Sequence, residues 1–239
     1  SGFTTTALVP EGYMLPGQVE VFYLSDELES IELLHEQLAQ GGSFEEAPGG
    51  WTSGVYPSTL MGVMAKFRQL MFDAEALQQH IKYYTQNPEM PAPDRDPGIE
   101  ALFPLLNKEV PIYFEVDQKE HIERLLKLKD EFGFDVVIVS GKEAYAKADD
   151  LKSRNIPVEL KDLATKLEIL LDEGSLSEDE ALKLMTQNTS KILGLDDRLG
   201  SLEEGKNASF SVFSKPFSEE KAKVLHSISN GTIHELNGE

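Results

Sequence analysis

Two acidic residues at the end of an apolar strand are the strongest candidates for chemistry in this sequence. Glu115 and Asp117 stand at the end of residues 111–116, where side chains alternate as in a β-strand. Positions two apart on a strand share a face, so both carboxylates can face one site. They could hold a hard cation or act as acid and base. The alternative is a polar strand end paired with Lys119 or Lys142, because two carboxylates are too few for a dedicated metal cage.

The other residue types with catalytic potential give no second site. No two of the five histidines have the His-x-His or His-x-x-x-His spacing of metal ligands, so we interpret each as a packing or solvated residue. These are His35, His80, His121, His226 and His234. The chain has no cysteine, which excludes disulfides, thiolate zinc sites and cysteine nucleophiles. No phosphate-loop motif is present.

Composition and charge narrow the classes of partner. The 239 residues are 40% hydrophobic and 27% charged, which is typical of a globular protein. The formal charge of −20 repels phosphate backbones, so we expect no nucleic-acid partner. No apolar run reaches the length that spans a bilayer, so we expect no membrane span.

The first half of the chain predicts strands followed by helices. Turn residues separate the segments, and Gly41-Gly42 is interpreted as a helix stop. We predict strands over residues 4–10 and 19–24, helices over 26–40 and 58–84, a proline-rich loop over 87–97, and a short helix over 99–106.

The second half has the rhythm of a parallel α/β sheet, followed by a β-rich tail. Strand, helix, strand, helix and strand alternate at βαβ spacing. We predict strands over residues 111–116 and 135–139 and from 157, with helices over 119–132 and 142–154. Helices are also predicted over residues 163–171 and 177–192, the second with a Ser177–Glu180 capping box and an end at Gly194. Strands over 209–213 and 228–236, the latter with a turn at Asn230-Gly231, follow.

Several phrases of the chain resemble the amidohydrolase superfamily, in particular its imidazolonepropionase-like branch. Residues 184–195 (LMTQNTSKILGL) and 198–210 (RLGSLEEGKNASF) resemble the C-terminal signature of the family, with Asn207 and Ser209 where acidic residues are usual. Residues 228–233 (ISNGTI) resemble its closing hairpin. Residues 2–5 (GFTT), 14–18 (MLPGQ) and 57–63 (PSTLMGV) resemble phrases of that branch.

The resemblance implies an α/β fold with two parts. We expect an incomplete (β/α)8 TIM-barrel-like body over residues 1–195 and a small C-terminal β-sandwich segment over residues 196–239. By family the activity would be metal-dependent hydrolysis of non-peptide C–N bonds. The alternative is a pseudoenzyme, a binding or structural relative that lost the metal; a third reading is a fragment of a longer enzyme. Fold alone does not establish activity, so whether the chain is an enzyme is left open.

The residues that would hold the family's metal are substituted in this sequence. Family members bind zinc or another divalent metal through histidines at strand ends, an aspartate, and often a carboxylated lysine. Residues 111–157 resemble barrel strands five and six of the family with their helices. By this resemblance the histidines of strand five fall on Glu115 and Asp117, and the histidine of strand six falls on Ser140. We therefore expect no competent metal site, assign no metal ligand or cofactor, and name Glu115 and Asp117 as the catalytic candidates.

Partners and compartment follow only in outline. A small-molecule substrate or ligand suits the family, and a homo-oligomer is left open. The chain opens on Ser1-Gly2-Phe3 as in the middle of a domain, so we expect the N-terminus of the full-length protein to be absent. The missing signal peptide therefore leaves a cytoplasmic and a periplasmic or secreted location, in a bacterial protein, both open.

Overall fold

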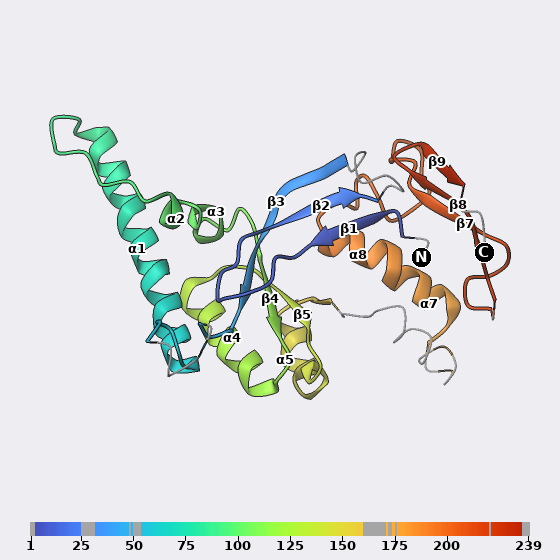
Figure 1. Ribbon diagram of the computed structural model, residues 1–239, viewed down its shortest axis with the longest axis horizontal. Coiled ribbons are helices and arrows are strands. Elements are labelled where there is room, and N and C mark those ends of the chain that lie inside the picture. Colours follow the sequence, from blue (N-terminus) through green and yellow to red (C-terminus); the bar gives the residue numbers. More distant parts are fainter. Residues whose placement is uncertain are drawn as a thin grey trace. The chain divides into compact units, whose positions relative to one another are not determined.

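The computed structural model describes residues 3–24, 32–47, 49, 54–159, 171, 174, 176–219 and 221–235. Its strands form a six-stranded sheet in the order β1-β2-β3-β4-β5-β6 and a three-stranded sheet in the order β7-β8-β9 (Figure 1). The strands are β1 (Thr5–Leu8), β2 (Gln18–Tyr23), β3 (Glu32–Ser43), β4 (Ile112–Val116), β5 (Val136–Ser140), β6 (Val158–Glu159), β7 (Phe210–Phe213), β8 (Val224–Ser229) and β9 (Thr232–Glu235). The helices are α1 (Leu60–Gln86), α2 (Pro97–Glu100), α3 (Phe103–Leu106), α4 (Lys119–Phe132), α5 (Ala148–Ser153), α7 (Glu178–Lys183) and α8 (Thr189–Ile192), with a 3-10 turn η3 (Ala144–Lys147) and a π-helical turn η4 (Leu184–Asn188).

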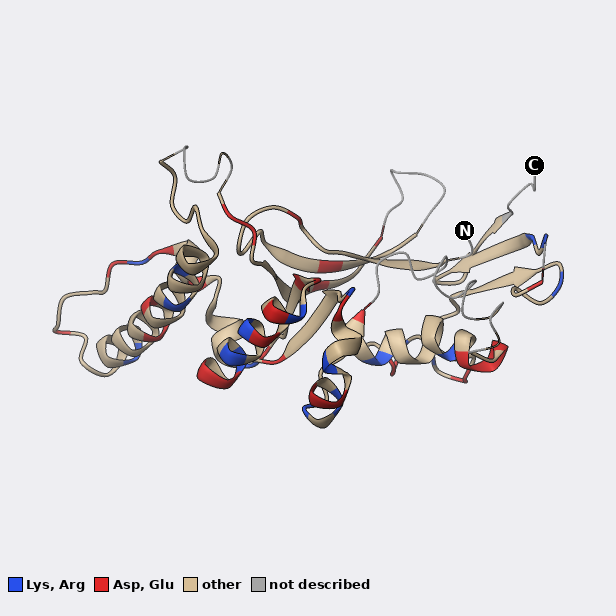
Figure 2. Ribbon diagram, turned by 90° about the horizontal axis from the view of Figure 1, so that it is seen from below, with Lys and Arg blue, Asp and Glu red and all other residues tan. Residues whose placement is uncertain are grey.

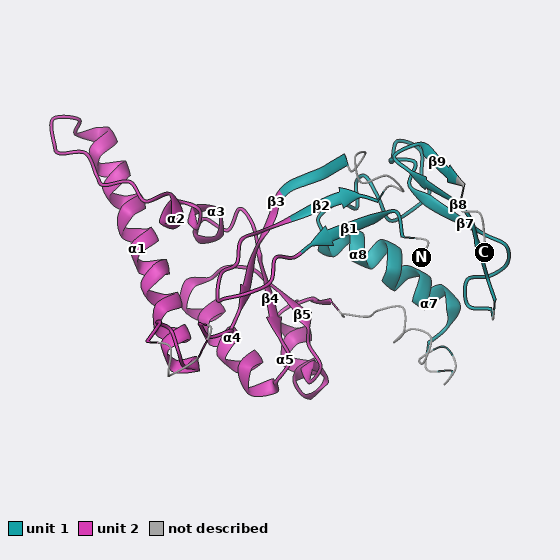
Figure 3. Ribbon diagram, viewed as in Figure 1, with its two compact units in different colours: residues 1–8, 20–36, 160–239 teal, residues 9–19, 37–159 magenta. Residues whose placement is uncertain are grey.

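The chain divides into two compact units (Figure 3). Unit 1 contains residues 1–8, 20–36 and 160–239, and unit 2 contains residues 9–19 and 37–159. Each unit is drawn from segments that are separated in sequence. The division of the chain at residue 195 into a barrel portion and a sandwich segment stays a prediction.

Unit 2 is built on parallel strands joined by helices. Its part of β3 pairs with β4, β4 pairs with β5, and β5 pairs with β6, all parallel. Helix α4 connects β4 to β5, and α5 lies between β5 and β6. This alternation confirms the predicted βαβ rhythm, and α4 has the bounds that its sequence pattern predicts.

The main core lies on one face of these strands. Apolar side chains from β4 and β5 alternate toward it, and helices α1 and α4 cover them. The buried members include Val63, Phe67, Met71, Ile112, Phe114, Val116, Ile122, Leu125, Val136 and Ile138. Figure 2 shows acidic and basic residues mixed along the helices of this unit, which leaves their apolar stripes to the core. No helix among the described residues is long and apolar enough to cross a membrane.

Strand β3 corrects one prediction from sequence. Residues 26–40 were predicted as a helix ended by Gly41-Gly42, but residues 32–43 form a strand and residues 25–31 lie outside the described residues. The two glycines belong to this strand. A Cβ on Gly42 would lie 2.7 Å from Cδ2 of Phe114, and one on Gly41 would lie 3.1 Å from the Gly17 carbonyl oxygen. The glycines therefore permit close strand and loop approach rather than a helix stop.

Unit 1 contains an antiparallel pair, a helical segment and the small sheet. β1 pairs antiparallel with β2, and β7, β8 and β9 pair antiparallel in turn. The Ser177–Glu180 capping box is present at the start of α7. Asn230 and Gly231 have φ values of 47° and 83°, as a tight hairpin turn requires. The predicted helix over residues 163–171 lies almost entirely outside the described residues.

Candidate functional site

The carboxyl ends of the parallel strands bring together the polar residues that the sequence separates. Ser43 on β3 is in register with Glu115 on β4, Glu115 with Val139 on β5, and Val139 with Glu159 on β6. These four positions form one row across the sheet. Functional residues of α/β barrels lie at this edge, because the loops that follow the strands meet there.

Asp117 follows β4 directly and is held by the loop after β5. Its Oδ2 forms an ion pair with Nζ of Lys142 at 2.6 Å, and Oδ1 accepts a hydrogen bond from the Lys142 backbone N–H at 3.4 Å. Its carboxylate also accepts a hydrogen bond from the Ser140 side chain. Burial alone would raise the pKa of Asp117, but these hydrogen bonds outweigh it and hold that pKa below its usual value.

A tight turn at the end of β5 delivers these donors. Ser140 and Gly141 have φ values of 76° and 57°, and Ser140 is buried. A Cβ on Gly141 would lie 2.7 Å from Cγ1 of Val158, so only glycine fits. The Gly141 N–H donates to the Val116 carbonyl at 3.0 Å, and the Glu143 N–H donates to the Asp117 carbonyl at 2.9 Å. The turn is therefore tied to the end of β4 by backbone as well as side-chain bonds.

Glu115 lies within β4 and is half-buried, between Ser43 and Val139 in the row. The structure places Glu115 and Asp117 at the same strand end, as predicted, and it shows the predicted pairing of Asp117 with Lys142. Lys119 instead pairs with Glu120, at 3.9 Å. The catalytic role of Glu115 and Asp117 stays a prediction.

Glu159 is a candidate that sequence reasoning missed. Its Oε2 atom is shielded from solvent and has no hydrogen-bond partner among the described residues. Burial raises the pKa of this carboxyl. The phenol of Tyr113 is also buried, and its pKa is raised by that burial and by the charge of Glu159. An acidic residue in the strand predicted from residue 157 was the signal that could have found it.

The histidines of unit 2 do not join this edge as a ligand set. The His121 ring stands edge-on to Phe44, with centroids 5.8 Å apart, which is a packing role. His80 lies exposed on α1. In the part of the chain that the structure describes, no three His, Cys, Asp or Glu residues are grouped so as to hold a metal.

The donor set therefore does not fit the metal centre that the resemblance implies. Ser140 offers a weak hydroxyl where that centre has an imidazole, and the Lys142 ammonium already neutralises Asp117. A cation there would have to displace Lys142, whose like charge opposes it. We assign no metal ligand among the described residues.

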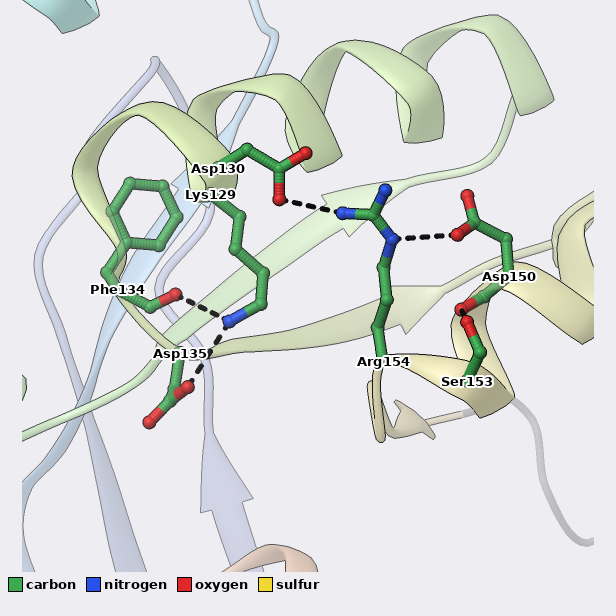
Figure 4. Close-up of polar contacts among 7 residues, drawn as sticks. All are labelled: Lys129, Asp130, Phe134, Asp135, Asp150, Ser153 and Arg154. Carbon is green, nitrogen blue, oxygen red and sulfur yellow. Dashed lines mark hydrogen bonds and ion pairs between the residues drawn. The ribbon is translucent and has the colours of Figure 1, made fainter.

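The opposite edge of the strands carries structural ion pairs (Figure 4). Arg154 donates from one guanidinium nitrogen to Asp130 and from Nε to Asp150, both at 2.7 Å, and so links α4 to α5. Lys129 donates to the Phe134 carbonyl at 3.0 Å and forms an ion pair with Asp135 at 3.3 Å. These contacts tie the end of α4 to the start of β5, as expected for the edge of a barrel that serves stability.

Comparisons with known proteins agree with this fold. A crystal structure of an amidohydrolase from Thermotoga maritima is similar with a TM-score of 0.85 and 24% sequence identity, over 96% of this chain and 71% of that chain. This likeness confirms the α/β, TIM-barrel-like fold expected from the sequence. A search of curated proteins gives no significant match. The family model described as "Amidohydrolase family" matches residues 26–234. The chain therefore belongs to the amidohydrolase family.

Proposed function

We propose that this chain is an amidohydrolase-like protein whose own strand ends form no metal centre, and that it serves as a non-catalytic binding relative of hydrolases that act on non-peptide C–N bonds. We place it in the imidazolonepropionase-like branch, on the phrases in its sequence. The observation that carries the proposal is the Asp117–Lys142 ion pair, which occupies the strand end where the family's chemistry would occur.

The chemistry of the family explains why this ion pair matters. A metal in such a site lowers the pKa of its bound water and polarises the scissile carbonyl. Its ligands must be deprotonated and free to coordinate. Both oxygens of Asp117 instead accept hydrogen bonds from Lys142, and Ser140 adds another donor. The carboxylate of Asp117 is thus neutralised and already hydrogen-bonded. This favours a role for the strand end in binding polar groups over a role in activating water.

A second candidate is a hydrolase that uses Glu115 and Asp117 as acid and base without the family's metal. It is favoured by their placement at one strand end and by the half-buried position of Glu115. Because its pKa is lowered, Asp117 is ionised near neutral pH and has no proton to donate. The same lowered pKa makes its carboxylate a weak base, so it is poorly suited to accept a proton. This is why the binding role is preferred.

Metal content and hydrolysis test the two candidates together. Protein of verified intact mass is incubated with zinc, manganese or iron(II), separated from free metal and measured by mass spectrometry, and it is assayed on linear and cyclic amides. We expect metal at background and no turnover. Near-stoichiometric metal that is lost in a Glu115→Gln, Asp117→Asn double variant, but kept in the exposed control Asp149→Asn, would contradict the proposal. Turnover without metal that is lost in Glu115→Gln would establish the second candidate.

A further inference from the structure

Helix α1 carries two apolar stripes, of which one is buried in the core and the other is largely exposed. The buried stripe is Val63, Phe67, Met71 and Ala74. On the opposite side, Met61 is 83% exposed, Phe72 49% and Tyr83 53%. The helix lies at the edge of unit 2 in both views of the chain (Figures 1 and 2). A second apolar stripe on an outward face is a typical mark of a docking surface.

The spacing of the exposed residues makes this stripe straight and symmetric. Met61, Phe72 and Tyr83 are each eleven residues apart. Eleven residues are close to three full turns, so the stripe drifts only about 20° per step around the helix. The helix has 27 residues and is about 40 Å long. Phe72 stands midway between the two other side chains.

The exposed residues Ala65, Ala76 and Gln79 along this stripe are uncharged, in a chain whose formal charge is −20, although Lys82 is exposed beside Tyr83. The exposed small residues Ala65 and Ala76 fill the positions between the three large ones. Two copies of so acidic a chain repel one another across most surfaces. A stripe of uncharged side chains is where they can approach with few like charges brought together.

One edge of the stripe adds complementary charges. Arg68 stands four residues before Phe72, and Glu75 stands three residues after it. When two such helices pair antiparallel about Phe72, each Arg68 lies beside Glu75 of the other helix, twice by symmetry. Arg68 also forms an ion pair with Glu131 at 2.7 Å, which orients its side chain.

We propose that two copies of this chain associate through α1, antiparallel and with Phe72 on the two-fold axis. Met61 of each copy then packs against Tyr83 of the other, and the two Phe72 rings meet at the centre. The Phe72 ring already packs against Phe132, with centroids 5.3 Å apart, so it is ordered before association. This inference is independent of the proposed binding function and of the strand-end residues.

The first test is the mass of the chain in solution as a function of concentration. Sedimentation equilibrium is run at low and at high salt, and we expect a reversible dimer that strengthens with salt as the acidic repulsion is screened. Met61→Glu and Tyr83→Glu should each weaken the dimer about tenfold or more, because every substitution acts at two symmetric contacts. Tyr145→Glu, at a residue that is 79% exposed on η3, is the matched control and should leave the dimer unchanged.

A second test reads the antiparallel register directly and does not depend on those variants folding. Ala65 and Gln79 are both exposed and lie seven residues to either side of Phe72. The chain has no cysteine, so Ala65→Cys and Gln79→Cys introduce single thiols. A mixture of the two variants should form a disulfide-linked dimer on oxidation, whereas Ala65→Cys alone should not. A monomer at every concentration, or cross-linking of Ala65→Cys with itself as efficiently as with Gln79→Cys, overturns the proposal.

Discussion

The protein should be less stable at neutral pH than its Glu159→Gln variant, because the carboxyl of Glu159 is shielded from solvent. Burial raises the pKa of this group, so the folded chain binds the proton more tightly than the unfolded chain does. The stability linked to that proton is fully present below the unfolded pKa and is lost as the pH rises through the raised folded pKa. Glu159→Gln keeps the shape of the protonated carboxyl and removes this linkage.

The size of the effect follows from the shielded oxygen. A buried charged group without a partner costs about 1–3 kcal/mol or more. Oε2 of Glu159 has no hydrogen-bond partner among the described residues. Glutamine also places a polar atom there, so the substitution removes the cost of the charge but not the whole cost of burying a polar group. We therefore expect Glu159→Gln to raise the free energy of unfolding by about 1–2 kcal/mol at pH 7, and by much less at about pH 4.

Urea unfolding followed by circular dichroism, at several pH values, measures this difference. Asp117→Asn is the matched control of opposite sign. The pKa of Asp117 is lowered, so its contribution is present above the unfolded pKa and is lost as the pH falls through the folded pKa. Because Asp117 is partly exposed, Asp117→Asn should lower the free energy of unfolding at pH 7 by at most about 1 kcal/mol. A Glu159→Gln protein that is no more stable than the parent at pH 7, or whose gain does not change with pH, would refute the reasoning.

Two further changes test the packing of unit 2, both by urea unfolding. Phe67→Ala removes a buried ring that packs against Phe134 with centroids 5.9 Å apart, and should cost about 3–5 kcal/mol. A cost below about 1 kcal/mol would mean that this core is loosely packed. Gly141→Ala should cost about 2–3 kcal/mol, because the added methyl meets Val158 at a backbone angle that alanine rarely adopts. Gly205→Ala is the comparison, since its φ is 93° but no atom lies within 4 Å of the new Cβ; an equal effect of the two would contradict the steric explanation.

Periodicity predicted the fold well where an element is defined by its own sequence. Helix α4 has a strong apolar stripe and is capped by Gly133, whose φ is 76°, so its C-terminal limit can be read directly. β3 failed for the opposite reason. Leu34 and Leu38 have helical spacing, but the pairing of residues 40–43 with β4 decides the conformation there. Tertiary pairing outweighs local propensity in such segments.

The candidate site was predictable in position but not in its bonding. Strand alternation located Glu115 and Asp117, and charge suggested Lys142 as a partner. The second donor, Ser140, depends on a left-handed turn that no local pattern requires of a serine. Glu159 was missed, although a strand from residue 157 was predicted, because nothing in the sequence around it marks its carboxyl as shielded from solvent. Its environment comes from register with β5 and not from its neighbours in sequence.

The parallel registers of unit 2 also set an order of assembly. Ile112 pairs with Val136, 24 residues later, whereas Gln40 pairs with Ile112 across 72 residues. Closing a loop three times as long costs about 1 kcal/mol more in chain entropy. The unit β4-α4-β5 can therefore form early from neighbouring segments, and β3 is expected to dock onto a surface that already exists. In folding kinetics, substitutions such as Leu125→Ala should slow refolding, while those in β3 should mainly accelerate unfolding.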